Sequence, residues 1–312
     1  MTKDIQKNIL FTIAYYDVMD YPLTTFEMWR HLLDSKNSRK QVSFLDVANA
    51  LESENLKKII SQTDGFWHFR SRRSDLARDR RAKQKISAGK FKMIKKWLKF
   101  LDATPYVRAV FATGTLAMKR SKIGSDWDVM IVLAKDRIWI GRLFSTLVLH
   151  LLGKRRYGKR IKNRFCLNHF LAEGGLILEE QSFFSANEVS FSVPLLGGSQ
   201  YKKFQQLNRT WVNSFQPNFS GDLAMGNVFL SPQLNRIVVK KFFELVFEKF
   251  LVGKFLNLTA KKFMIRKIQR NEKTHLEGAD VRYSDQAMVF LPRPQRDKIM
   301  QKAISKLTIS SR

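Results

Sequence analysis

The sequence predicts a mixed α/β protein of the α+β class, in which a small mixed sheet lies between a helix-rich N-terminal part and a helical C-terminal part. Three observations support this prediction. Apolar residues recur at helical spacing near both ends, short runs of β-branched and aromatic residues gather in the middle, and turn-forming residues separate these runs. The 312 residues, 44% of them apolar, suffice for two or three domains with apolar cores.

The first part of the chain is predicted to form three helices followed by a β-hairpin. Apolar residues at helical spacing predict a first helix over residues 5–19. Capping patterns that begin at Thr24 and Ser43 start a second and a third helix. Two short strand-like runs meet at Asp64-Gly65, a pair typical of hairpin turns. This order over residues 1–72 predicts a winged-helix-like domain.

A basic helix over residues 73–104 is predicted to connect this domain to the next. From Arg70 to Lys99 the sequence holds 13 Lys or Arg against two Asp. Residues 58–85 are therefore a possible contact for a nucleic-acid backbone, because clustered arginines neutralise phosphates. The alternatives are a solvated structural helix, a protein-docking winged helix, and hairpin aromatic residues that pack in a core. The arginines are Arg70, Arg72, Arg73, Arg78, Arg80 and Arg81, and the aromatic residues are Phe66, Trp67 and Phe69.

The chain is strongly basic, with 56 Lys or Arg against 27 acidic residues and a formal net charge of +29. Such a charge attracts polyanions: nucleic acid, nucleotide phosphates or an anionic membrane surface. Charge alone does not choose among these three partners.

A cytoplasmic location is expected from the single cysteine, Cys166, which excludes an intramolecular disulfide and a cysteine-rich zinc site. The most apolar stretch, residues 138–152, contains Arg142 and His150 and is shorter than the roughly 20 apolar residues that a membrane span needs. We therefore expect a buried helix there and no transmembrane segment.

The middle of the chain, residues 105–175, is predicted to hold strands at 107–112, 126–133 and 164–171. The apolar helix at 138–152 lies between the second and the third strand.

The candidate site lies in the stretch VFATGTLAMKRSKIGSDWDVMIV, residues 110–132, which reads as strand, glycine turn, short helix, loop and strand. Gly114 lets the backbone approach a ligand closely, and Thr115 offers a hydroxyl and a backbone N–H to a phosphate. Asp126 and Asp128 are two apart in a strand, so both carboxylates point to one face. Paired carboxylates are suited to hard divalent ions such as Mg²⁺ or Mn²⁺.

The pattern of Gly114-Thr115, a gap of ten residues and then Asp126-Trp127-Asp128-Val129 resembles the signature of the polymerase-beta-type nucleotidyltransferase superfamily. The resemblance covers roughly residues 105–175, and Thr115 keeps the hydroxyl of the serine common in that family. It implies a minimal nucleotidyltransferase core that transfers a nucleoside monophosphate from ATP, or another nucleoside triphosphate, to a hydroxyl, with Mg²⁺ or Mn²⁺ bound by the two aspartates.

The resemblance also implies a third acid on the next strand, where we align Asn168. An amide oxygen can bind a metal or orient an acceptor, but it cannot act as a general base. We expect the adjacent His169 to be structural. Because the third acid is missing, the alternative function is a catalytically degenerate protein of this fold that binds nucleotide or nucleic acid as a regulator or adaptor.

Polar and basic residues around the aspartates are candidates to bind the nucleotide. Lys119, Lys122 and Ser125 lie in the loop before Asp126, and the basic run at 154–160 precedes the third strand. Either group of basic residues can neutralise a triphosphate, and the alternative is a solvated basic surface.

The rest of the chain, residues 176–312, is predicted to be a C-terminal helical domain, with residues 177–270 entirely helical. Its strongest element runs from Leu234 to Leu256, with apolar residues every three or four positions. We expect this helix to pack in a bundle rather than to lie on a membrane. The domain would choose the acceptor, which the sequence leaves open among a small molecule, an RNA end and a protein side chain.

Overall fold

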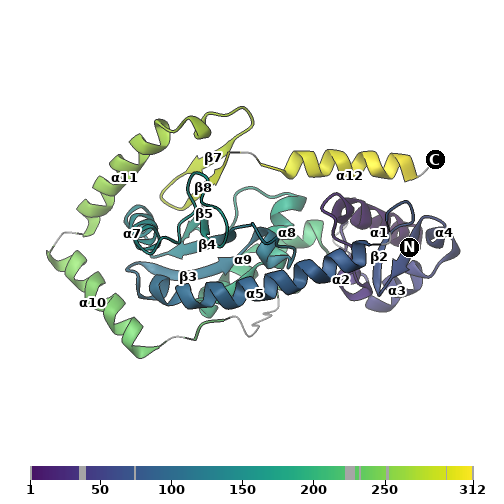
Figure 1. The fold of residues 1–312 in the computed structure, drawn as a ribbon, viewed down its shortest axis with the longest axis horizontal. Coiled ribbons are helices and arrows are strands. Elements are labelled where there is room, and N and C mark those ends of the chain that lie inside the picture. The colour runs from purple at the N-terminus through teal and green to yellow at the C-terminus, as the bar shows by residue number, and fades with distance from the viewer. Residues whose placement is uncertain are drawn as a thin grey trace.

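The computed structural model describes residues 2–34, 40–73, 75–221, 229–231, 233–250, 253–292 and 294–310. Within these residues it contains twelve α-helices and a six-stranded mixed sheet (Figure 1). The strand order is β6-β3-β4-β5-β8-β7. The predicted α+β class with a mixed sheet is therefore confirmed.

The three predicted strands form the centre of this sheet. They are β3 (Val107–Ala112), β4 (Trp127–Leu133) and β5 (Phe165–Ala172). β3 is antiparallel to β4, and β4 is parallel to β5. The predicted apolar helix is α7 (Ile138–Leu151), and it connects the parallel pair. A parallel pair requires such a crossover, because a tight turn can join only antiparallel strands.

Three further strands come from the part of the chain that was predicted to be helical. They are β6 (Val193–Leu196), β7 (Asp280–Tyr283) and β8 (Ala287–Leu291). β6 pairs with β3, and β8 pairs with both β5 and β7. The prediction that residues 177–270 are entirely helical is thus wrong at β6. A strand of four residues is too short to show a period of two in the sequence.

The other elements of the C-terminal part are helical. They are α8 (Phe183–Phe191), α9 (Gly198–Phe215), α10 (Leu234–Phe250), α11 (Gly253–Gln269), a short 3₁₀ turn (Glu272–Thr274) and α12 (Arg296–Ser310). The single helix predicted from Leu234 to Leu256 is divided between α10 and α11, and residues 251–252 lie outside the described residues.

The N-terminal part contains the helices and the hairpin in the predicted order. They are α1 (Thr2–Asp17), α2 (Thr25–Arg30), α3 (Phe44–Leu51), a short α4 (Glu54–Lys57), β1 (Ile60–Thr63) and β2 (Phe66–Phe69). The side chains of Thr24 and Ser43 cap α2 and α3 as predicted, and the hairpin turns at Asp64-Gly65.

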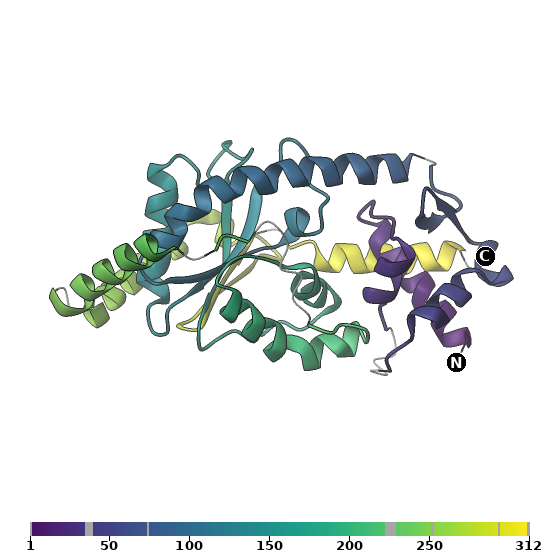
Figure 2. The same ribbon diagram turned by 90° about the horizontal axis from the view of Figure 1, so that it is seen from below.

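Two long helices extend from the sheet to the N-terminal helices (Figures 1 and 2). The predicted basic helix is α5 (Leu76–Ala103), and the other is α12. Ala303 of α12 is fully buried in the same apolar cluster as Ile5 and Ile9 of α1. Lys306 forms an ion pair with Asp17 at the end of α1. The last helix of the chain therefore packs against the first.

No helix in the described ranges is both long enough and apolar enough to cross a membrane, as the sequence predicted.

Candidate active site around Asp126 and Asp128

The two aspartates lie at the start of the central strand β4. Asp126 immediately precedes the strand and is buried, and Asp128 is half-buried within it. Trp127 and Val129 belong to the apolar core on the opposite face of the sheet. Carboxylate oxygens of Asp126 and Asp128 lie within 4.8 Å of each other and of the Cys166 thiol. The predicted pair is therefore brought together on one face.

Gly114 packs directly against Asp128. Its φ of 56° is in the left-handed region, at the start of the four-residue helix α6 (Gly114–Ala117). A Cβ atom added there would lie 2.7 Å from Oδ2 of Asp128. The Thr113 backbone N–H donates to the Asp128 carbonyl oxygen over 3.0 Å. Only glycine adopts this backbone angle easily and also leaves room for the carboxylate, which explains why residue 114 is a glycine.

The electrostatics of the pair favour a bound cation. Burial, and secondarily the neighbouring Asp126, raise the pKa of Asp128 from an ordinary 3.8 to about 6. A hydrogen bond from the backbone of Thr115 and the charge of Arg156 oppose this rise in pKa without cancelling it. A divalent ion between two nearby carboxylates offsets the repulsion between their charges and the loss of solvation on burial.

Arg156 already neutralises one of the carboxylates. Its Nη1 atom lies 2.6 Å from Oδ2 of Asp126 and 3.3 Å from Sγ of Cys166. Arg156 belongs to the basic run at 154–160 that was expected to neutralise a triphosphate. Here its guanidinium occupies an oxygen that a metal ion would need.

The register of β5 differs from the prediction. Asp128 pairs with Cys166, and two positions later Met130 pairs with His169, so β5 carries one extra residue between these pairs. Such a bulge shifts which side chains face the partner strand. Asn168 lies in the bulge, and its Oδ1 atom is buried without a hydrogen-bond partner among the described residues. The neighbour of Asp128 on β5 is therefore Cys166 and not Asn168.

The donor set fits a hard cation through its oxygens only. Burial, followed by the charges of Asp128 and Asp126, raises the pKa of the Cys166 thiol to about 12, so the thiol is protonated near neutral pH. Mg²⁺ and Mn²⁺ prefer oxygen ligands, whereas Zn²⁺ binds thiolate and lowers the thiol pKa when it does so. Asp126 and Asp128 can thus hold Mg²⁺ or Mn²⁺, with Cys166 beside the ion as a neutral neighbour.

The loop before Asp126 contains three of the predicted nucleotide-binding residues. Lys119 and Lys122 are exposed, and Ser125 is half-buried with its hydroxyl donating to the Lys122 carbonyl oxygen over 2.9 Å. Lys119 lines a separate pocket between α2 and α8. The structure gives neither lysine a hydrogen bond or ion pair with the aspartates, so their contact with nucleotide stays a prediction.

Lys90 of α5 fixes this loop, a role that the sequence analysis missed. It is buried, and its Nζ donates to the carbonyl oxygens of Ile123 and Ser125 over 3.2 and 2.7 Å. A third bond of 2.8 Å reaches Oδ1 of Asn163. Burial lowers the pKa of Lys90, and Asp126 opposes that change. The basic helix therefore positions the residues that lead into Asp126.

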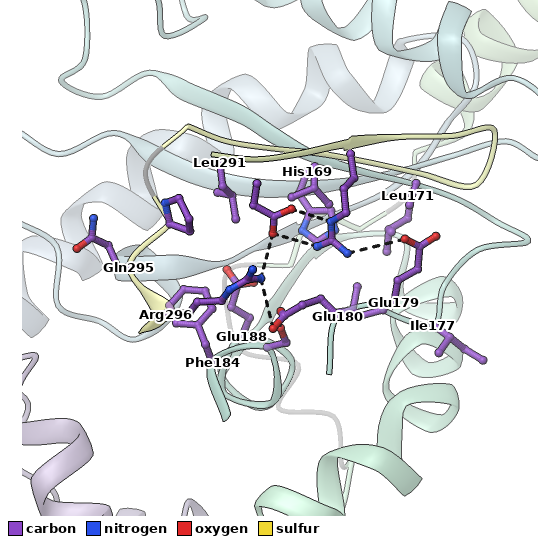
Figure 3. A pocket seen from close by; sticks show the side chains of 17 residues that line it. His169, Leu171, Ile177, Glu179, Glu180, Phe184, Glu188, Leu291, Gln295 and Arg296 are labelled. Atoms are coloured by element: carbon purple, nitrogen blue, oxygen red, sulfur yellow. Dashed lines mark hydrogen bonds and ion pairs between the residues drawn. The ribbon is translucent and has the colours of Figure 1, made fainter. Parts of the chain in front are cut away.

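A pocket lies beside the sheet between β5, the β7–β8 hairpin and α8 (Figure 3). Its wall is largely apolar, and neither aspartate of the pair is part of it. Burial, and then Arg282, lower the pKa of His169 in this wall to about 4, so the imidazole is neutral. The apolar lining residues are Leu171, Ile177, Leu178, Phe184, Ala287, Val289 and Leu291.

Most of the charged groups of the pocket pair with one another. Asp280 accepts from Nε of Arg282 over 2.7 Å and from Nη1 of Arg296 over 3.1 Å. The same arginines contact Glu179 at 3.8 Å and Glu180 at 3.5 Å (Figure 3). These charges hold the wall together and are not available to a ligand without loss of an existing pair.

Glu188 is the exception, and the sequence analysis missed it. Its carboxyl has no hydrogen-bond or ion-pair partner within the described ranges, and it lines the pocket among the side chains of α8 (Figure 3). Burial, then the charges of Asp128 and Glu180, raise its pKa to about 8. Glu188 therefore lies within electrostatic reach of the aspartate pair and also faces the pocket.

Two arginines of the predicted nucleic-acid contact at residues 58–85 are already paired with carboxylates of the protein. Arg80 is fully buried, with Nη2 at 2.9 Å from Oε1 of Glu27. Arg72 pairs with Asp17 and Asp20. The aromatic residues at 66, 67 and 69 are buried, so they pack in the core and offer no stacking surface. Phosphate contacts stay a prediction only for the exposed arginines of this segment.

Comparison with known proteins finds no match: no protein-family model, no curated protein and no solved structure matches this chain.

Proposed function

We propose that this protein is a metal-dependent nucleotidyltransferase that moves a nucleoside monophosphate from ATP or another nucleoside triphosphate to a hydroxyl group. One observation carries the proposal. The carboxylates of Asp126 and Asp128 lie close together, and that of Asp128 rests against Gly114, where a side chain would strike its Oδ2 atom.

Each residue of the site has a chemical part in this proposal. Asp126 and Asp128 hold Mg²⁺ or Mn²⁺, which supplies charge for the departing pyrophosphate. Gly114 and Thr115 meet the triphosphate with their backbone. Once a metal occupies the oxygen of Asp126, Arg156 is free to pair with a phosphate, because arginine binds phosphate as well as carboxylate.

The pocket beside the pair is the proposed place for the acceptor. Glu188 lines the pocket, and the charge of Asp128 is one cause of its raised pKa; a carboxyl whose pKa is near the working pH is an effective proton acceptor. It would take the proton of the acceptor hydroxyl, a step that the amide of Asn168 cannot perform.

The proposal is tested by thermal unfolding with MgATP and by transfer from labelled ATP. A ligand that binds only the folded state raises the melting temperature by mass action. MgATP should raise that of the wild type, and Asp126→Asn with Asp128→Asn should abolish most of the rise. Asp297→Asn, at an exposed acid on α12, is the matched control. An equal rise in the double variant would remove the aspartates from the site.

A second candidate, binding of nucleotide without transfer, is favoured by two contacts. Arg156 occupies Asp126, and the neighbour of Asp128 on β5 is a thiol rather than an acid. Labelled ATP incubated with the protein and a cell extract separates the two candidates. A labelled acceptor supports transfer, whereas nucleotide binding without any labelled product supports the regulator.

A further inference from the structure

One face of helix α10 exposes apolar residues to solvent, and charged residues on another face form ion pairs with the protein body. The sequence analysis expected the apolar stripe to pack in a bundle, and this expectation is wrong. The exposed fractions of Leu234, Val238, Phe242 and Leu245 are 78%, 56%, 59% and 62%. These residues recur every three or four positions and so share one face.

The inner face of α10 is held by ion pairs and hydrogen bonds instead of apolar contacts alone. Arg236 lies 2.6 Å from Asp102, Glu244 lies 2.7 Å from Arg108, and Glu248 lies 2.6 Å from Arg137. Lys240 contacts Asp102 and the carbonyl oxygen of Val107. This charged network fixes the rotation of the helix, so the apolar stripe cannot turn inward without breaking several ion pairs.

Helix α11 continues the same surface pattern. Its inner face contributes Ala260, Met264 and Ile268 to the main apolar core. Its outer side exposes Phe255 and Leu258, with Phe263 exposed beside them. The two helices, together called the α10–α11 segment, lie at the end of the molecule opposite the N-terminal helices (Figures 1 and 2).

The α10–α11 segment carries a large excess of positive charge. Residues 234–270 contain ten Lys or Arg and only two acids, Glu244 and Glu248. Both acids pair with arginines of the protein body. Exposed cations that border the apolar residues include Lys241, Lys249, Lys254, Lys262, Arg266, Lys267 and Arg270.

From this arrangement we propose that the α10–α11 segment docks on an anionic lipid surface. Apolar side chains flanked by Lys and Arg enter the boundary between headgroups and acyl chains, and the cations attract acidic headgroups. A second copy of the chain is a poorer occupant, because a symmetric pair would bring two cationic faces together. The proposal does not depend on the nucleotidyltransferase chemistry.

The test is sedimentation of the full chain with phosphatidylcholine vesicles, with and without about one third phosphatidylserine. The wild type should sediment with the anionic vesicles and much less with the neutral ones, and high salt should release it. Substitution of Phe242, Leu245 and Phe255 by Ser should weaken the partition into anionic vesicles at least tenfold. No binding of the wild type to anionic vesicles, or equal binding to both kinds, would overturn the proposal.

A matched control replaces three exposed apolar residues elsewhere, Leu45, Leu207 and Ile304, by Ser. This control variant should bind as the wild type does. Thermal unfolding followed by circular dichroism should show that both variants fold. Sedimentation velocity without vesicles provides the last check. If the wild type is a dimer and the Phe242, Leu245 and Phe255 variant is a monomer, a second copy of the chain covers this surface and the lipid proposal is overturned.

Discussion

Replacement of Gly114 by Ala tests the contact on which the site depends. The backbone at φ 56° disfavours any residue with a Cβ atom, and left-handed backbone costs an L-residue about 1–2 kcal/mol. The new Cβ would also lie 2.7 Å from Oδ2 of Asp128. Moving that carboxylate off its preferred rotamer adds about 0.5–1.5 kcal/mol. We expect a total loss of about 1.5–3.5 kcal/mol in the free energy of unfolding.

Gly158 provides the matched control, because its φ is 52° and an added Cβ would meet nothing within 4 Å. Gly158→Ala should therefore show the backbone cost alone. Urea unfolding gives the two free energies, and a Mn²⁺ titration followed by melting temperature gives metal affinity. Gly114→Ala should weaken Mn²⁺ binding, and Gly158→Ala should not.

A double-mutant cycle identifies the contact itself. In an Asp128→Ala background the oxygen is absent, so Gly114→Ala should cost no more than Gly158→Ala. If the two glycine variants are equally destabilised in the wild-type background and bind Mn²⁺ equally well, the carboxylate does not pack on Gly114 and the reasoning is refuted.

Three further predictions concern titration, loop fixation and proton transfer. The pKa of Asp128, about 6 in the folded protein against an ordinary 3.8, means that without metal the folded state retains a proton that the unfolded state releases. The contribution of Asp128 to the free energy of unfolding should therefore fall by up to about 3 kcal/mol between pH 4 and pH 6. Urea unfolding should show a smaller fall over this range in Asp128→Asn than in the wild type, and equal slopes would contradict it; Glu188, whose pKa is raised to about 8, adds its own fall up to that pH in both proteins. Lys90→Met removes three hydrogen bonds and should lower the free energy of unfolding by about 2–3 kcal/mol, measured with urea, whereas an unchanged value would show that the loop is held by other contacts. Glu188→Gln should leave the MgATP-induced rise in melting temperature intact and abolish transfer from labelled ATP, so normal transfer by this variant would exclude Glu188 as the proton acceptor.

The central strands and the aspartate pair could be predicted because their signals are local. The alternation around Asp126 and Asp128, and the glycine turn before them, lie within one short stretch of sequence. The order of helices and hairpin at the N-terminus is readable for the same reason, since capping residues and an Asp-Gly turn act on their immediate neighbours.

The partners of the aspartates could not be predicted, because each depends on a distant or irregular feature. A bulge in β5 places Cys166 rather than Asn168 opposite Asp128. The residues of this strand give no sequence signal for the extra residue of the bulge. Glu188 lines the pocket only because α8 packs beside the sheet. Helical spacing likewise shows that the apolar residues of α10 share a face, but not that the face points to solvent.

The packing of α12 against α1 has a consequence for synthesis on the ribosome. Residues 2–17 are translated well before residues 296–310, and α12 buries part of the apolar surface of α1. At about 5–20 residues per second the interval is on the order of tens of seconds. Throughout that time the first helices expose apolar side chains that are covered in the finished protein. Nascent-chain chaperones therefore have prolonged access to α1, and the docking of α12 ends that access.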